Sequence, residues 1–402
     1  MDAADVAWLR TSEGARATEA VEALRAGGRN DLGVLRALAR EWSPPQARAA
    51  LALVEGRAAA AAKLPDAERL FCDRDAAEQT SDARVSAHLA QRFGALELDG
   101  GPVADLGCGM GGDALAIAVH APVLAIDRDP ARLAMLAANA DARGLAARIE
   151  LCAADLATWT PPAGVGAIWA DPARRSDRGR ELLPERWSPP LARVLELARS
   201  VAGAGVKLAP GVDLDALPPL DGPAELEFVS LERGLRAAVL WLGTLARHAR
   251  TATVLPEGAT LTRDVGVAPL ASTLGAPGRY LYDPDPAIGR AGLVAELAAQ
   301  LDAWQLDARI AYLSADSPID TPFARRFAIR ACLPFAERAI ADALRAAGAR
   351  RVEVARRGSP VDTNALERRL NGTLRARPDG PVLVVVLTRV RSTHVALICE
   401  RE

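Results

Sequence analysis

The chain has 402 residues, about two to three times the usual size of one domain, so we expect more than one hydrophobic core. Hydrophobic residues make up 50% and charged residues 25%, which are ordinary globular values and exclude a disordered or fibrous chain. No apolar run reaches the ~18 residues of a membrane span, and the N-terminal segment lacks the pattern of a signal peptide. We therefore expect a soluble, cytoplasmic protein without a membrane partner.

The cysteines and the charged residues further limit the classes of protein to which the chain can belong. Five scattered cysteines without a Cys-x-x-Cys pair favour neither a disulfide framework nor a structural metal site. The formal net charge is only −2, but residues 323–391 hold 15 arginines and six acidic residues. Only Lys63 and Lys207 are lysines, so part of the arginine richness is a compositional bias. The C-terminal excess of positive charge nevertheless points to an anionic partner.

In chain order, the first predicted region is helical. Residues 1–66 are rich in Ala, with Leu and Val at helical spacing, and Pro65 ends the last helix. From 67 to 248, short apolar runs alternate with helical stretches, the pattern of a parallel sheet covered by helices. The expected strands are 102–106, 123–127, 148–152, 166–170, 205–208, 225–231 and 237–242, with helices at 111–121, 130–144 and 189–202. The last two strands would form an antiparallel hairpin.

The third predicted region, residues 249–402, is a small α+β module. We expect a helix near 291–303, a helix over 333–347, a strand over 351–355 and a helix over 363–370. Two further strands, VLVVVLTRV and HVALICE, follow near the end of the chain. This order of elements differs from the βα alternation of the central region and indicates a separate domain.

The most informative segment is DLGCGMGGD at 105–113, which follows one predicted strand and begins a helix. Gly107, Gly109 and Gly111 let the backbone approach a ligand closely, and the start of the helix offers free N–H groups. The letters also satisfy Gly-x-Gly-x-x-Gly, and Asp127 ends the next strand. A nicotinamide-dependent dehydrogenase is therefore an alternative.

Charge distinguishes the two candidate ligands. A dinucleotide would place its pyrophosphate beside the carboxylate of Asp105, which would repel it, whereas S-adenosylmethionine (SAM) brings an ammonium and a sulfonium to the same place. Asp127 suits a ribose diol, and Asp155, after the third strand, can reach the adenine amino group. Three carboxylates at successive strand ends predict SAM as the cofactor.

These residues carry a resemblance to a known family. DLGCGMGGD with Asp127 and Asp155 resembles motifs I, II and III of class I SAM-dependent methyltransferases. Residues 70–93 resemble the segment before motif I in the trimethylguanosine synthase-like branch, in which a Ser/Thr-containing turn lies against the methionine end of SAM. The resemblance implies an α/β fold with a Rossmann-like seven-stranded sheet. It implies cofactor contacts from Gln79, Thr80, Ser81, Asp105, Gly107, Cys108, Gly109, Gly111, Asp127, Arg128, Asp155 and Leu156.

The C-terminal region has a resemblance of its own. YLYDPDPAIGRAG at 280–292, ARRG at 355–358 and VVVLTRV at 384–390 are similar to the THUMP-like domain attached to bacterial methyltransferases of this branch. This resemblance implies that the region binds a structured RNA. Arg356 and Arg357 are then candidates for phosphate contacts, which would position an RNA without reading its sequence.

The acceptor is expected at the end of the fourth strand, in AIWADPARR. In amino-methylating relatives a D/N/S-P-P-aromatic turn lies there, and its polar side chain and first proline carbonyl accept hydrogen bonds from an exocyclic amino group. Asp171 and Pro172 match the first two positions, whereas Ala173 and Arg174 do not match the last two. An arginine plane, or a ring from Trp169 or Phe71, would have to replace the missing aromatic residue.

Arg174 and Arg175 also begin a cluster of arginines, which is either a phosphate clamp or a loop of ion pairs. We expect a SAM-dependent N-methyltransferase that modifies a guanine-like amino group in structured RNA, with Asp171 and Pro172 aligning the acceptor. A methyltransferase of small molecules or proteins is one alternative. A catalytically silent RNA-binding protein that retains SAM is the other.

Overall fold

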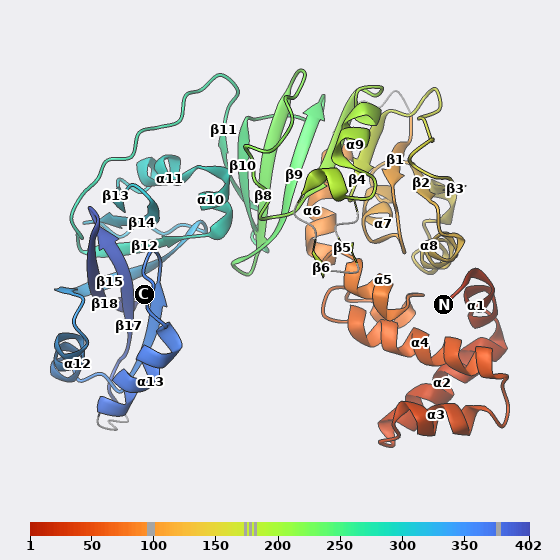
Figure 1. Cartoon of the computed structure of the whole chain (residues 1–402), viewed down its shortest axis with the longest axis horizontal. Helices are drawn as coiled ribbons and strands as arrows, with labels where there is room; N and C mark the ends of the chain where they lie inside the picture. The colour runs from red at the N-terminus through yellow and green to blue at the C-terminus, as the bar shows by residue number, and fades with distance from the viewer. Residues whose placement is uncertain (95–100, 173–174, 177–178, 181–182, 375–378) are drawn as a thin grey trace. The chain divides into compact units, whose positions relative to one another are not determined.

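The computed structural model describes residues 1–94, 101–172, 175–176, 179–180, 183–374 and 379–402. The chain forms two compact units, residues 1–225 with 237–247 and residues 226–236 with 248–402 (Figure 1). The division into three domains at residues 66 and 248 stays a prediction. Within the described ranges, no helix combines the length and the apolar character that crossing a membrane requires.

Four helices begin the first unit. Asp2, Thr11 and Asn30 cap the first three by accepting backbone N–H groups, and Pro44 occupies the first position of the fourth. The helices pack on one another, and a second core cluster joins Leu70 to residues of the sheet region such as Met110. These helices are α1 (Ala3–Leu9), α2 (Ser12–Ala26), α3 (Asp31–Leu38) and α4 (Pro44–Ala60).

A mainly parallel sheet forms the centre of the first unit. Its strands are β1 (Val103–Leu106), β2 (Val123–Asp127), β3 (Ile149–Ala153), β4 (Ala167–Ala170), β7 (Gly203–Leu208) and β9 (Gly234–Gly243). The order is β9-β7-β4-β1-β2-β3, and only β9 is antiparallel to its neighbour. Strand β1 therefore lies between β2 and β4, where the strand order reverses. A ligand of such a sheet binds at the carboxyl ends of these strands.

Helices and short connections complete the first unit (Figure 1). The strands β1, β4 and β7 are buried along their whole length, in agreement with the apolar runs that predicted them. The other elements are η1 (Ala67–Arg69), α5 (Arg74–Gln79), α6 (Ala83–Gly94), α7 (Gly112–Ala118), α8 (Pro130–Ala142), η2 (Ala146–Arg148), β5 (Arg175–Ser176), β6 (Gly179–Arg180), η3 (Pro184–Arg186) and α9 (Leu191–Ala198).

The second unit contains two groups of strands. In the first group β8 (Ala224–Leu231) is parallel to β10 (Arg250–Leu255), which is antiparallel to β11 (Ala259–Arg263). The second group is a sheet of order β13-β14-β12-β15-β18-β17-β16, antiparallel except for the pair β16 and β17. Its strands are β12 (Tyr280–Pro284), β13 (Trp304–Asp307), β14 (Ile310–Ala315), β15 (Ala324–Pro334), β16 (Arg351–Arg356), β17 (Val382–Val390) and β18 (Thr393–Arg401).

Four helices accompany this sheet, and two of them differ from the sequence-based expectation. The helix expected over 333–347 begins only at Glu337, because residues up to Pro334 extend β15 and pair with β18. The helix expected near 291–303 spans only Val294–Gln300, because Gly292, left-handed with φ 71°, ends a separate helix before it. The helices are α10 (Pro286–Ala291), α11 (Val294–Gln300), α12 (Glu337–Ala346) and α13 (Thr363–Thr373).

Candidate cofactor and acceptor site

The glycine-rich segment forms a tight turn between β1 and α7. Gly111 caps the helix with φ 96°, and a Cβ on it would lie 2.2 Å from Cδ1 of Leu136, so only glycine fits. On the other side of the turn, a Cβ added to Gly107 or Gly109 would meet no described atom within 4 Å. The turn therefore leaves open space where a ligand can approach the backbone.

The carboxylate of Asp127 is fixed at the end of β2. Its Oδ2 accepts the N–H of Gly109 at 3.0 Å, and its Oδ1 accepts the N–H of Asp129 at 2.9 Å. Each oxygen keeps a second lone pair for a ligand hydroxyl. Arg128, beside it, is exposed, as is Asp155, whose Oδ1 accepts the N–H of Ala157 at 2.9 Å. Their contacts with the cofactor stay predictions, as do those of the buried Cys108 and the half-buried Leu156.

Asp105 contributes a buried carboxyl on β1, just before the glycine turn. The residue is 3% exposed. Burial raises the pKa of the Asp105 carboxyl well above its usual value, and the nearby carboxylates of Asp113, Asp171 and Asp127 raise it further. A cation bound beside this group would offset both effects. The site is therefore suited to a positively charged ligand.

The turn that joins α5 to α6 lies against the glycine-rich segment. A Cβ on Gly112 would be 2.2 Å from Oγ1 of Thr80, which is buried and has no hydrogen-bond partner within the described part of the chain. The hydroxyl of Ser81 accepts a hydrogen bond from Lys207. Gln79, at the end of α5, is exposed. The structure thus brings Thr80 and Ser81 to motif I, whereas the predicted contact of Gln79 stays a prediction.

A cluster of ionisable side chains lies where β4 and β7 end. Nζ of Lys207 is 2.9 Å from Oδ2 of Asp171 and 3.4 Å from Oδ2 of Asp113. Asp113, in the first turn of α7, also accepts hydrogen bonds from Ser86 and from Nε1 of Trp169. Burial alone would raise the pKa of Asp113, but Lys207 and these two donors hold it below its usual value. Asp113 is therefore ionised at neutral pH.

Three residues of this region were not predicted. Asp113 belongs to the quoted motif but was assigned no role, and Lys207 lies within the strand predicted at 205–208. Asn139 on α8 is fully buried; its Oδ1 accepts the N–H of Phe71 at 2.6 Å, and its Nδ2 donates to the carbonyl of Met110 at 3.0 Å. It thereby holds the glycine turn to the preceding segment. The sequence feature that could have drawn attention to Lys207 is the rarity of lysine, since the chain has only two.

Trp169 and Phe71, the two aromatic residues suggested to stack on a base, lie in different environments. Trp169 is 1% exposed and makes an edge-to-face contact with Phe93, with ring centroids 6.1 Å apart, so the suggestion that it stacks on a base is wrong. Phe71 is half-buried and packs between the helical clusters. Ala173 and Arg174 lie outside the described residues, and the backbone of Arg175 begins β5. Substrate contacts of both arginines stay predictions.

Several of the C-terminal arginines form ion pairs. Arg357 and Arg325 both contact Asp283, at 3.0 and 2.8 Å, and Arg326 contacts Glu402 at 2.7 Å. Arg356 donates to the carbonyl of Val361. Several of the acidic partners lie outside 323–391, so the charge excess counted along the sequence overstates the local charge. Phosphate contacts of Arg356 and Arg357 stay a prediction.

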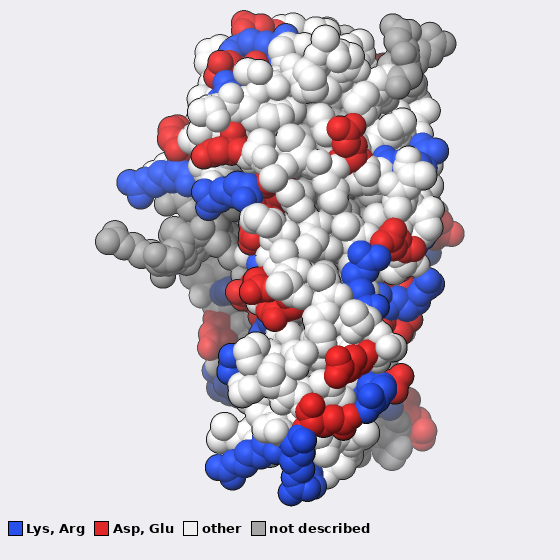
Figure 2. Space-filling model, turned by 90° about the vertical axis from the view of Figure 1, so that its right-hand side faces the viewer, with Lys and Arg blue, Asp and Glu red and all other residues white. Residues whose placement is uncertain are grey.

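The surface of the first unit shows a similar mixture of charges. Figure 2 views the side on which α1 and α8 lie, with acidic and basic side chains interspersed around a broad uncharged surface. Ion pairs of this region join Arg143 to Asp66 and Arg10 to Asp141. The described residues of this side therefore form no extended patch of one sign.

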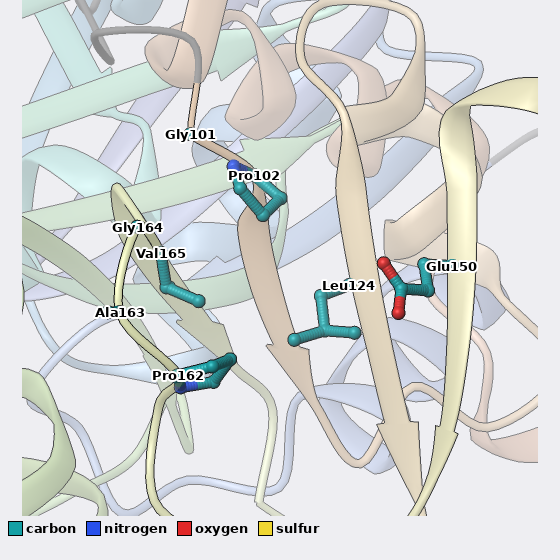
Figure 3. Close-up of a pocket in the computed structure, with 8 residues that line it drawn as sticks. All are labelled: Gly101, Pro102, Leu124, Glu150, Pro162, Ala163, Gly164 and Val165. Atoms are coloured by element: carbon teal, nitrogen blue, oxygen red, sulfur yellow. The ribbon is translucent and has the colours of Figure 1, made fainter.

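A cavity of about 430 Å³ lies elsewhere on the sheet of the first unit (Figure 3). It is lined by Pro102, Leu124, Glu150 and residues 162–165, which precede or begin their strands. This is the amino-terminal edge, opposite the glycine turn. Among the described residues, no group of three or more His, Cys, Asp or Glu side chains is placed to hold a metal ion.

The residues at the carboxyl edge fit SAM. Open space beside Gly107 and Gly109 admits a ligand to the backbone, and Thr80 offers a buried, unpartnered hydroxyl. Asp105 supplies a buried carboxyl for positive charge, and Asp127 a fixed carboxylate for the ribose hydroxyls. These carboxyl and hydroxyl groups therefore suit a positively charged nucleoside better than a pyrophosphate.

Comparison with known proteins agrees with this geometry. The family model described as RNA cap guanine-N2 methyltransferase matches residues 101–181, and the model described as THUMP domain-like matches residues 324–401. An uncharacterized SAM-dependent methyltransferase of Mycobacterium tuberculosis strain H37Rv is 36% identical over 343 residues, 82% of this chain and 88% of the relative. The chain belongs to this family of SAM-dependent methyltransferases.

A solved structure extends the comparison to the fold. A protein from Porphyromonas gingivalis W83 described as a methyltransferase has a TM-score of 0.67 and 19% identity, covering 90% of this chain and 92% of its own. The fold is therefore that of a class I methyltransferase with a THUMP-like C-terminal region. The predicted family, fold class and cofactor are confirmed, and the alternative of a nicotinamide-dependent dehydrogenase is wrong.

Asp127→Ala is expected to weaken SAM binding at least tenfold. The variant loses the charged acceptor for the ribose hydroxyls and also releases the N–H of Gly109 in the glycine turn. Isothermal calorimetry with SAM measures the effect. The matched control is Asp129→Ala, an exposed helix cap beside the same strand end, which should retain most of the affinity. Equal losses in both variants would contradict the assignment of Asp127.

The affinity for SAM is expected to increase as pH rises through the raised pKa of the Asp105 carboxyl, above the range in which aspartates usually ionise. The folded-state pKa of Asp105 is raised, so at low pH the carboxyl is protonated and the positive charge of SAM has no counter-ion there. In the complex, the positive charge of SAM favours the ionised form of the Asp105 carboxyl. SAM binding to protein with a protonated Asp105 therefore releases a proton. Calorimetry over a pH series checks this expectation. Asp105→Asn should remove the pH dependence, and an unchanged dependence would assign it to another group.

Proposed function

We propose that the protein methylates an exocyclic amino group of a guanine-like nucleobase in structured RNA. The main observation in support is that Asp171 and Pro172 directly follow β4. The last residue of this strand, Ala170, pairs with Leu106 beside the glycine turn. The family model that covers this segment is named for guanine-N2 methylation of RNA caps. The THUMP-like region supports RNA as the acceptor.

The proposed mechanism is alignment of the acceptor. Bound SAM supplies a methyl group activated by the sulfonium. The carboxylate of Asp171 and the carbonyl of Pro172 accept hydrogen bonds from the amino group and direct its lone pair toward that methyl group. The buried Lys207, which also contacts Asp113, holds Asp171 in place. A displacement of this kind gains most of its rate from proximity and orientation.

The test is a transfer experiment with the full chain. Total RNA from a strain lacking the protein is incubated with SAM carrying a labelled methyl group, and the RNA is digested to nucleosides. Label in an N2-methylated guanosine is the expected result. Label in a protein or metabolite fraction instead would favour the other substrate classes. SAM binding without transfer to any fraction would favour the silent binder.

RNA binding itself is tested by its salt dependence. Phosphate contacts release counterions, so the affinity should fall as salt concentration increases. Truncation at residue 323 is unsuitable for this purpose, because β15, β17 and β18 belong to the same sheet as β12. The affinity is therefore measured on the intact chain. Salt-insensitive binding would argue against a phosphate-binding surface.

A further inference from the structure

Lys207 connects three elements of the site at one atom. Its ammonium donates to Oγ of Ser81, in the turn between α5 and α6, and contacts Asp171 after β4 and Asp113 on α7. The side chain is only 6% exposed. A buried ammonium shared by two carboxylates fixes both, because its removal would leave them uncompensated. Lys207 therefore ties the turn on the cofactor side to the turn on the acceptor side.

The other lysine of the chain holds the same cofactor-side turn. Nζ of Lys63 donates to the carbonyls of Ala77, Glu78 and Thr80 at 3.1, 2.7 and 3.1 Å. The remaining 47 of the 49 basic residues are arginines. A lysine ammonium directs three donors from one nitrogen, whereas the planar guanidinium is larger and presents a fork. The two exceptions to the arginine bias thus occur where several acceptors converge on one point.

We propose that Lys207 is a positioning residue that couples the Thr80–Ser81 turn to Asp171, so that cofactor binding organises the acceptor turn. This inference rests on the proposed role of Asp171 in the acceptor site. Lys207 contacts neither the methyl group nor the acceptor. Its effect passes through the carboxylate of Asp171, which it orients by direct contact at 2.9 Å. Lys63 holds only the cofactor-side turn and provides the matched control.

A readout that needs no acceptor tests the coupling. Hydrogen exchange is measured by mass spectrometry on the full chain with and without saturating SAM. In the wild type, SAM should slow exchange in the peptide that contains Asp171. In Lys207→Met this protection should be lost, while Lys63→Met should retain it once SAM is saturating. Equal protection in Lys207→Met and the wild type would overturn the proposal, whatever the acceptor is.

A kinetic double-mutant cycle gives the second readout, with whichever acceptor the wild type methylates. Lys207→Met should lower kcat about 10- to 100-fold, as expected for a residue that orients a functional group. In the Asp171→Asn background the same change should cost much less. Lys63→Met should cost the same factor in both backgrounds. If Lys207→Met lowers kcat by the same factor in the wild type and in the Asp171→Asn background, Lys207 only stabilises the fold and the proposal is overturned. If RNA is not the acceptor, only the proposed function is contradicted.

Discussion

Asp171→Ala is expected to lower turnover by about two to four orders of magnitude while leaving SAM affinity nearly intact. The side chain directly follows β4, is 24% exposed and pairs with Lys207 at 2.9 Å, whereas we assign the SAM contacts to Asp105, Asp127 and Thr80. Its loss removes one charge-assisted hydrogen bond and the alignment of the acceptor. Steady-state kinetics with the acceptor fraction, together with calorimetry for SAM, measures both quantities.

Asp171→Asn provides the sharper comparison. An amide oxygen still accepts a hydrogen bond from an amino group, so this variant should retain more activity than Asp171→Ala. It also weakens the ion pair with Lys207, which predicts activity below the wild type. Equal turnover in the wild type and the alanine variant would show that Asp171 serves only as a turn residue.

The central sheet was largely predictable because its strands are short, apolar and separated by helical patterns. All seven expected strands are present, six of them in the sheet of the first unit and the strand expected at 225–231 as β8 of the second unit; β1 at 103–106 and β4 at 167–170 are close to the predicted limits. Buried parallel strands need apolar residues on both faces, and this requirement is visible in the sequence. The glycine turn and Asp127 were predictable for a related reason, since they lie within one local motif.

The remaining features depend on contacts between distant parts of the chain. Lys207 approaches Asp171 and Ser81 only after β7 takes its place beside β4. Likewise, the arginines of the C-terminal region gain acidic partners such as Asp283 and Glu400 from other strands. A count of charges along a window of sequence cannot include partners from outside it. Local patterns therefore located the cofactor motif but not the ionic contacts around it.

Arg92→Met is expected to lower the free energy of unfolding of the first unit by about 3–5 kcal/mol. Arg92 on α6 donates through both terminal nitrogens to Glu225, at 2.8 and 3.1 Å, and lies 4.8 Å from the ring centroid of Trp241. Glu225 has no exposed side-chain area, so the substitution would take the Arg92 counter-charge away from a buried carboxylate. Urea unfolding followed by tryptophan fluorescence measures the loss.

Two comparison variants distinguish the buried charge from a general effect of mutation. Arg92→Met combined with Glu225→Gln should recover part of the lost stability, because the amide can be buried without an unpaired charge. Arg74→Ala removes an ion pair with Glu78 at a side chain that is 72% exposed, and it should leave the unfolding midpoint unchanged. Because the chain has two units, unfolding need not be two-state, so the fluorescence transition of the first unit, which holds six of the seven tryptophans, is compared among variants. No recovery in the double variant would mean that Arg92 contributes mainly through its packing on Trp241.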